Sequence, residues 1–161
     1  MVVENRTVEH LIKEVTAVYE WIDSQARLHK KQSGECRACG DCCDFVGFDH
    51  RLFVTPVELI YLAANLGADD IKKMKTGRCP YQTDGKCVIY KYRFAGCRIF
   101  CCKGDRDFQS RLSESILRRL KSICVRYKIS YQYLDLATAL NSFSIGTCRS
   151  AGESCPGDRA G

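Results

Sequence analysis

Apolar residues near the start of the chain recur at three- and four-residue steps from residue 7 to residue 32. That spacing places them on one face of a helix, so it predicts a long amphipathic helix over this range. Lys30 and Lys31, followed by Ser33 and Gly34, are typical of a helix C-terminus. The residues of the apolar face are Val8, Leu11, Ile12, Val15, Val18, Tyr19, Ile22 and Ala26.

The sequence TPVE, Thr55 to Glu58, predicts the start of another helix. Threonine is a common N-cap, proline fits the first turn, and a glutamate three residues after the cap completes a capping box. We expect this helix to continue through LIYLAANL to Gly67, because glycine suits the left-handed residue after a helix. Residues 68–76 are expected to add a further helical turn.

A second long helix is predicted over residues 107–128, followed by a final helix over residues 131–141 with Ser130 as its N-cap. The apolar face of the long helix comprises Phe108, Leu112, Ile116, Leu120, Ile123 and Tyr127. Its other face is basic and carries Arg111, Arg118, Arg119, Lys121 and Arg126.

Two cysteine-rich segments, residues 36–43 and 77–104, interrupt the helical pattern. Both are expected to be mostly loop and to pack against each other, with a turn at Asp84-Gly85 and a short strand over residues 87–90. Residues 45–54 are expected to form a short strand or an extended link. The pattern predicts a mostly α fold with little β structure: one domain over residues 1–145, two irregular cysteine-rich loops, and a flexible tail over residues 146–161.

Cysteine is the outlier of the composition, at 12 of 161 residues. The N-terminus lacks the basic start and apolar run of a secretory signal, and no stretch approaches the roughly 18 to 20 apolar residues of a membrane span. We therefore expect a cytoplasmic protein with reduced thiols, in which clustered cysteines indicate metal or redox chemistry rather than disulfides. The net charge of +6 permits an acidic partner but is not a nucleic-acid signature.

The sequence CRACGDCC, residues 36–43, brings four cysteines together. Thiolates are soft ligands that suit zinc, copper(I) and iron–sulfur clusters. Zinc sites usually combine two separated pairs of ligands, whereas a C-x2-C-x2-C run resembles the loop around a cubane cluster in bacterial ferredoxins. The spacing therefore favours an iron–sulfur cluster of the [4Fe–4S] type, with zinc as the alternative. Gly40 fits either a loop that approaches such a cluster closely or an ordinary turn.

The second segment adds Cys79, Cys87, Cys97, Cys101 and Cys102, which makes nine cysteines between positions 36 and 102. Eight would serve two four-ligand sites, or one multinuclear site with spare thiols. Crowded thiolates need positive charge nearby, which bound metal would provide and which Arg37 and Arg98 would provide more weakly.

Three segments together resemble the YkgJ-like CxxCxxCC family of zinc- or iron-chelating proteins: CRACGDCC at 36–43, TPVELIYLA at 55–63 and GRCPYQTDGKCVIYKYRFAGCRIF at 77–100. The resemblance covers residues 30–105, and Phe94 stands where the family usually has proline. It implies a metal site and leaves the reaction open, although a similar domain occurs in the flagellin lysine methylase. The implied ligands are Cys36, Cys39, Cys42, Cys43, Cys79, Cys87, Cys97 and Cys101. The neighbouring Cys102 leaves the last ligand ambiguous.

Several functions are compatible with the sequence. The first is an iron–sulfur protein for electron transfer, or a redox or modifying enzyme with a redox or protein partner. The second is a structural zinc module that presents the basic helix to a protein or nucleic-acid partner, although nucleic-acid binding is not favoured. The third is metal storage or delivery. The HExxH, GxxxxGK[ST] and GxSxG motifs are absent. Enzyme status stays open because nine candidate cysteines exceed the needs of any single site, and the sequence does not reveal the oligomeric state.

Some residues have alternative interpretations. Cys36 and Cys39 could form a thiol redox pair, although the preceding helix argues against a thioredoxin-like context. His50 could replace one cysteine and give a Cys3His site, but a loop histidine is the simpler interpretation. Three cysteines, Cys124, Cys148 and Cys155, fall outside the motifs and are not expected to be ligands.

Overall fold

A computed structural model describes residues 5–144 of the chain. Of these residues, 58% are helical and 7% lie in strands or bridges, so the predicted mostly α fold is confirmed. The predicted tail over residues 146–161 and the domain boundary at residue 145 lie outside the described residues. None of the helices in residues 5–144 combines the length and the apolar character that crossing a membrane requires.

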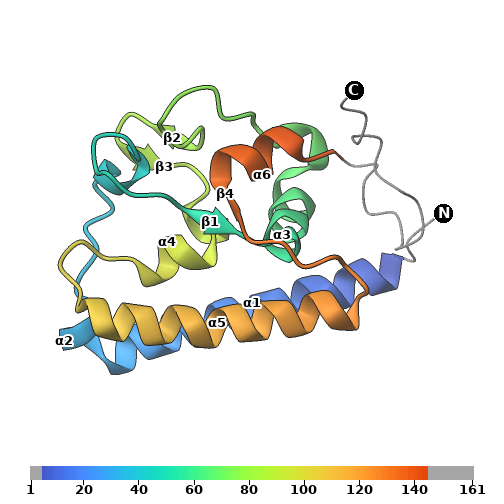
Figure 1. Cartoon of the computed structure of the whole chain (residues 1–161), viewed down its shortest axis with the longest axis horizontal. Coiled ribbons are helices and arrows are strands. Elements are labelled where there is room, and N and C mark those ends of the chain that lie inside the picture. The colour runs from blue at the N-terminus through green and yellow to red at the C-terminus, as the bar shows by residue number, and fades with distance from the viewer. Residues whose placement is uncertain (1–4, 145–161) are drawn as a thin grey trace, which may run out of the picture.

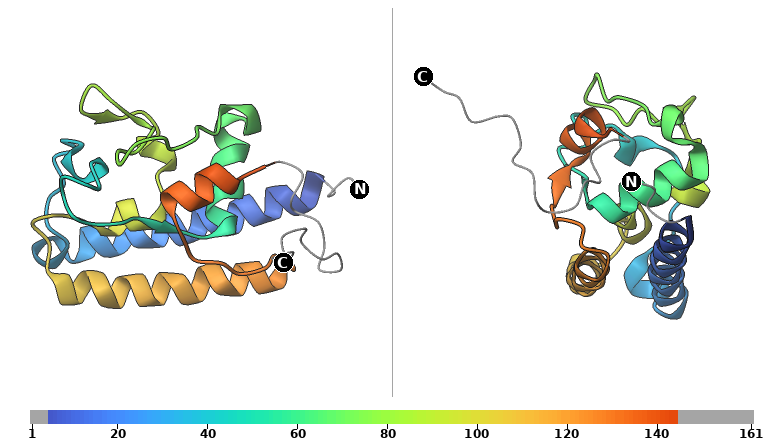
Figure 2. Two further views of the ribbon diagram at one scale, coloured as in Figure 1. Left: turned by 45° about the horizontal axis from the view of Figure 1, so that its top comes forward. Right: turned by 90° about the vertical axis from the view of Figure 1, so that its right-hand side faces the viewer.

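Two long helices form one layer of the molecule. Helix α1 (Asn5–Leu28) and helix α5 (Arg106–Arg126) lie side by side and run in opposite directions, as Figure 1 and Figure 2 show. The short helix α2 (Lys30–Ser33) follows α1 and ends at the predicted stop. At the start of α5, the Asp105 carboxylate accepts the Phe108 backbone N–H at 2.7 Å, which satisfies a donor that a helix N-terminus leaves unpaired.

The predicted apolar faces of these two helices are confirmed, because both are buried in a first core. Residues of a third and a fourth helix, described below, complete it. The buried members of the first core are Leu11, Val15, Val18, Tyr19, Ile22, Val57, Tyr61, Ala95, Ile99, Leu112, Ile116, Leu120, Ile123 and Cys124.

A second layer covers the long helices (Figure 2) and contains α3 (Pro56–Leu66) and α6 (Leu136–Ser142). Helix α3 begins at the predicted TPVE signal and ends before Gly67, and the 3₁₀ helix η2 (Ala68–Asp70) supplies the expected further turn. A second core joins these elements. Its buried members are Val54, Leu59, Leu62, Met74, Tyr81, Ile89, Phe94, Leu136, Ala139 and Leu140.

The helix predicted over residues 131–141 starts later than expected. Strand β4 (Leu134–Asp135) pairs with β1 (Phe53–Val54) in an antiparallel sheet, and α6 begins only at Leu136. Asp135, rather than Ser130, is the N-cap, and its carboxylate accepts the Thr138 backbone N–H at 3.1 Å. The prediction of Ser130 was wrong because Leu134 and Asp135 pair with β1, so the helix begins only after them.

The second cysteine segment is more regular than predicted. It contains the hairpin of β2 (Gln82–Thr83) and β3 (Lys86–Cys87), the 3₁₀ helix η3 (Tyr90–Tyr92) and helix α4 (Ala95–Ile99). The turn at Asp84-Gly85 is confirmed, and both residues have positive φ, as a type I′ hairpin turn requires. The predicted strand over residues 87–90 shortens to β3, because the chain turns into η3 after Cys87.

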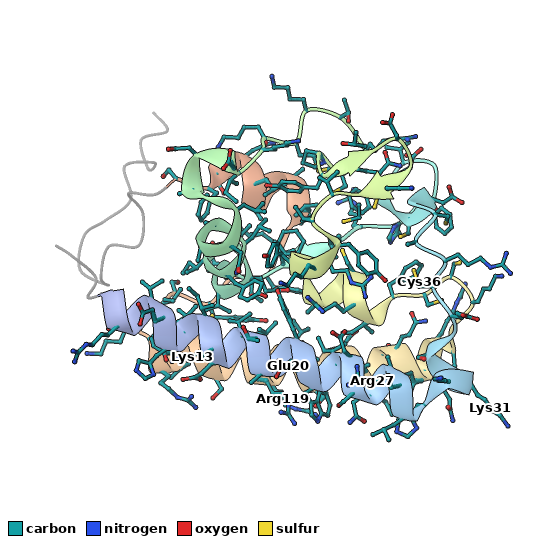
Figure 3. The ribbon with its side chains drawn as sticks, turned by 180° about the vertical axis from the view of Figure 1, so that it is seen from behind. Lys13, Glu20, Arg27, Lys31, Cys36 and Arg119 are labelled. Atoms are coloured by element: carbon teal, nitrogen blue, oxygen red, sulfur yellow. The ribbon has the colours of Figure 1, made fainter. Side chains whose placement is uncertain are left out.

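The two cysteine segments lie against each other at one end of the molecule. The first contains the 3₁₀ helix η1 (Asp41–Cys43), and Asp44 forms an antiparallel bridge with Arg78. The Cys79 backbone N–H donates to the Cys43 carbonyl at 2.8 Å. We refer to residues 34–52 and 77–103 as the cysteine end. In Figure 3 the labelled Cys36 belongs to it and lies above the end of the first helical stretch, which Lys31 marks.

Glu58 joins the layers although its side chain is only 2% exposed. Its carboxylate accepts the Thr55 backbone N–H at 2.8 Å and the Thr55 hydroxyl at 2.9 Å. It also accepts the Ala95 backbone N–H at 2.8 Å and the Tyr19 hydroxyl at 3.3 Å. One buried carboxylate therefore links α1, α3 and α4.

Candidate metal centre

A cavity of about 360 Å³ opens at the cysteine end. Six cysteines line it, and they come from the first segment, the residues just before the hairpin, the hairpin itself and α4. They are Cys36, Cys42, Cys43, Cys79, Cys87 and Cys97. Residues separated by up to 61 positions in the chain are thus brought to one site (97 minus 36).

The thiols of Cys42, Cys43 and Cys79 lie close enough together to shift the pKa values of Cys42 and Cys43. Cys87 and Cys97 lie close enough for their charges to affect this group. Five thiols therefore share one small volume, while Cys36 is exposed at the rim.

The environment of these sulfurs disfavours free thiolates. The hydrogen bond to Cys43, followed by burial, raises the pKa of Cys42 far above its usual range. The bond from Cys42 lowers the pKa of Cys43, but its own bond to Cys79 and its burial outweigh this and raise that pKa to about 11. Burial is the main cause of the raised pKa of both Cys87 and Cys97. A nearby cation is needed before these sulfurs ionise at neutral pH.

In residues 5–144, no group of three or more His, Cys, Asp or Glu side chains is arranged so that it could hold a metal ion as it stands. The thiols of the cavity are gathered near one another in their protonated form. Metal binding would draw the sulfurs onto the metal and release their protons.

Arg93 is the cation that faces the thiols. Its charge partly offsets the rise that burial causes in the pKa of Cys87 and Cys97. Its guanidinium carbon lies 3.9 Å from the centre of the Tyr90 ring. The buried Nε of Arg93 has no hydrogen-bond partner within the described part of the chain. An unpaired buried donor is costly, so a site beside it is suited to a sulfur or another acceptor that carries negative charge.

Arg98, which the sequence suggested as a positive charge for the thiols, has a different role. It forms an ion pair with Asp23 of α1 at 2.8 Å, and its guanidinium carbon lies 4.4 Å from the centre of the Tyr19 ring. It also donates to the carbonyls of Lys91 at 2.7 Å and Arg93 at 3.1 Å. Arg98 thus attaches the backbone that carries Arg93 to the long helix.

The importance of Arg93 was missed at the level of sequence. The only available signal was its position in the motif that carries the family resemblance. Its direction depends on η3 and on the anchoring by Arg98, which no local pattern specifies.

Two predicted ligands lie outside the cavity lining. Cys39 is exposed, whereas Cys101 is buried. The Cys101 side chain faces Gly34: a Cβ added at Gly34 would lie 2.9 Å from the Sγ of Cys101. Of the other cysteines, Cys102 is exposed and Cys124 is fully buried in the first core. Cys148 and Cys155 lie outside the described residues.

His50 lines the cavity but is held by the protein. Its Nε2 donates to the Cys42 carbonyl at 2.7 Å, so this nitrogen carries a proton and is not free to bind a metal. Its ring stacks on Phe100, with 5.1 Å between centroids and 25° between planes. His50 therefore fixes the loop that presents Cys42 and Cys43.

Gly40 adopts a positive φ of 78° and lies tightly against the hairpin turn. A Cβ at this position would lie 2.5 Å from the Gly85 carbonyl oxygen. The glycine is thus required by close approach of the two cysteine segments to each other.

Comparison of the chain with protein-family models, with curated proteins and with solved structures gives no match. The resemblance to the YkgJ-like family therefore depends on the motifs in residues 30–105 alone.

Proposed function

We propose that this protein binds an iron–sulfur cluster through thiols of the cysteine end, in a reducing, cytoplasmic setting. The observation that carries the proposal is the convergence of five thiols and the unpaired Arg93 Nε on one cavity. The candidate ligands are Cys42, Cys43, Cys79, Cys87 and Cys97, with Cys36 at the rim. Cys39 and Cys101 stay predictions of the family resemblance.

The donor set fits such a group. Thiolates are the usual protein ligands of iron–sulfur clusters, and the positive charge of the iron favours ionisation of thiols whose pKa is otherwise raised. Arg93 would donate its free N–H toward a thiolate or sulfide, and Arg98 and His50 would hold the backbone on either side. When bound, a cluster supplies one-electron transfer, so the proposed activity is electron transfer or a redox or modification reaction with an unidentified partner.

The alternative, a zinc module that presents a basic helix, has less support. Three of the five basic side chains on that helix are engaged within the protein. The guanidinium carbon of Arg119 lies 4.1 Å from the centre of the Trp21 ring, and the Nζ of Lys121 lies 5.6 Å from the centre of the Tyr131 ring. Arg126 forms an ion pair with Glu14. A surface used in this way offers fewer free charges to a nucleic acid.

The proposal is tested by measuring iron, acid-labile sulfide and zinc, together with the visible spectrum, in protein purified without oxygen. We expect iron and sulfide in similar amounts and a broad visible absorption. Cys42→Ser and Cys97→Ser should lose most of this metal, whereas Cys102→Ser should retain it. Tightly bound zinc without sulfide, or full iron in both variants, would refute the proposal.

A further inference from the structure

The cavity extends from the cysteines to the first turns of α5. Its other walls are the segment around Arg51 and Phe53, helix α4, and Tyr133 before β4. We propose that this part of the cavity binds a small organic anion with a flat, apolar body. The site is argued from side chains outside the cysteine set, whereas a role for the anion as substrate rests on the proposed function.

The charge of the lining points to an anion. The cavity is lined by Arg51, Arg93 and Arg106 and by no aspartate or glutamate. The side chains of Arg51 and Arg106 are exposed, and their guanidinium groups form no hydrogen bond or ion pair with other described residues. The charge of Arg51 helps to lower the pKa of nearby Asp135. Guanidinium groups with free donors are suited to carboxylates, sulfonates and phosphates.

Helix α5 presents a polar stripe to the cavity. Arg106, Ser110 and Ser113 are spaced by four and three residues, so they lie on one face of the helix, and all three line the cavity. The hydroxyls of Ser110 and Ser113 have no hydrogen-bond partner in the described structure. The neighbouring Gln109 differs, because its amide donates to the Cys101 carbonyl at 2.8 Å. The stripe therefore offers one cation and two hydroxyl donors to a bound molecule.

The remaining walls are aromatic. Phe53 and Tyr133 contact each other with 5.3 Å between ring centroids, and they stay 38% and 44% exposed at the cavity. Phe100, stacked on His50, lines the same cavity. Flat rings of this kind pack well against another flat, apolar group. The whole cavity, including the part that the cysteines line, has a volume of about 360 Å³, which lies within the range of small-molecule sites.

The probe we would use is 2-naphthoate, titrated calorimetrically to millimolar concentration into the full chain as purified without oxygen. The comparison compounds are 2-naphthalenemethanol, which is neutral, and 2-naphthylmethylamine, which is a cation. We expect one saturable site for the carboxylate and about tenfold weaker binding of both comparison compounds, because each lacks the charge-assisted hydrogen bonds.

Two variants and a matched control localise the site. Arg106→Gln and Arg51→Gln should each weaken binding of 2-naphthoate by about tenfold. Arg118→Gln, which changes an exposed arginine farther along α5, should leave the affinity unchanged. All three side chains are exposed, so circular dichroism should show the same fold in each variant.

The proposal is overturned if 2-naphthoate does not saturate, if the amine binds equally well, or if both cavity variants keep the original affinity. Metal and sulfide are measured in the same samples. Binding of 2-naphthoate to protein without iron would leave the ligand site standing and refute only the iron–sulfur proposal. If 2-naphthoate does not bind to protein with an intact cluster, the ligand site is refuted and the iron–sulfur proposal stands.

Discussion

The two long helices and the cysteine end are built on different physical principles. In α1 and α5, buried apolar side chains such as Val15, Ile22 and Ile116 are at most 1% exposed and form a continuous core. At the cysteine end no element exceeds five residues. A few of its side chains, such as Tyr81, Ile89 and Phe94, are buried in the second core, and polar contacts join the remaining pieces. Three of the four non-glycine residues with positive φ in the described chain, Ala38, Asp49 and Asp84, lie at this end.

This difference indicates what each region requires. Burial of apolar surface stabilises the helices without any ligand. Thiols are weak hydrogen-bond partners, so the cluster of five sulfurs contributes little order by itself. The cysteine end therefore depends on a few buried side chains, such as Tyr81, Ile89 and Phe94, on polar anchors to the helices and, in the proposed function, on bound metal. The predictions below act on these anchors, from the largest expected effect to the smallest.

Replacing Glu58 should have the largest effect, because its carboxylate connects both regions. Glu58→Leu leaves the backbone N–H groups of Thr55 and Ala95 buried without their acceptor. We expect the free energy of unfolding to fall by about 3 kcal/mol or more. Urea titration followed by circular dichroism measures this value. The control is Glu20→Gln, at an exposed position on α1 that Figure 3 labels, and it should change stability little; equal effects would contradict the assigned role.

Arg98→Gln should separate the cysteine end from α1. The change removes the ion pair with Asp23 and the bonds to the Lys91 and Arg93 carbonyls, from a side chain that is only 8% exposed. We expect a loss of about 2 kcal/mol in urea titration, together with faster proteolysis of the cysteine end. Arg27→Gln on the exposed side of α1 is the matched control. A variant as stable as this control would show that Arg98 is not an anchor.

Arg93→Gln tests the counter-charge of the proposed centre. Because the side chain supplies positive charge and a free Nε–H to the thiols, we expect metal affinity to fall about tenfold, as for changes next to metal ligands elsewhere. Competition with a chelator measures the affinity. Arg78→Gln removes a salt bridge to Asp44 and a 3.4 Å hydrogen bond to Gln82, both from an arginine side chain that is 53% exposed, so its effect should be small. Equal losses in the two variants would contradict a specific role for Arg93.

The smallest expected effect is a pH dependence of stability. Burial raises the pKa of Glu58 above the usual 4.5, despite the hydrogen bonds that favour its ionised form. The folded state then binds this proton more tightly than the unfolded state. The stabilising contribution is complete below pH 4.5 and declines as the pH rises through the raised pKa. Urea titrations over this pH window should show that the free energy of unfolding declines with rising pH in the wild type and not in Glu58→Gln. If the free energies of both proteins change with pH in parallel, other groups cause the dependence.

The helical region could be predicted from sequence because its signals are local. The three- and four-residue spacing located α1 and α5, and TPVE located the start of α3. The Asp84-Gly85 turn was also readable, since its positive φ angles depend on residue type. These signals need no knowledge of distant parts of the chain.

The cysteine end could be predicted only in part. The spacing of cysteines suggested a shared site, but not that Cys39 and Cys101 lie outside the cavity lining. Helix α4 gave no periodic signal because it has five residues, and its Ala95 N–H is bound by the distant Glu58. The role of Arg98 likewise arises from its ion pair with Asp23 of α1, which lies 75 residues away in the chain (98 minus 23). Arg98 in turn holds the backbone that carries Arg93.

The central claim is that metal organises the cysteine end while the long helices are stable without it. Hydrogen–deuterium exchange on metal-loaded and chelator-stripped protein tests it most directly, read by peptide along the chain. We predict that removal of metal accelerates exchange in residues 34–52 and 77–103 and leaves α1 and α5 protected. Unchanged protection throughout the cysteine end, or equal loss of protection in both regions, would contradict the claim.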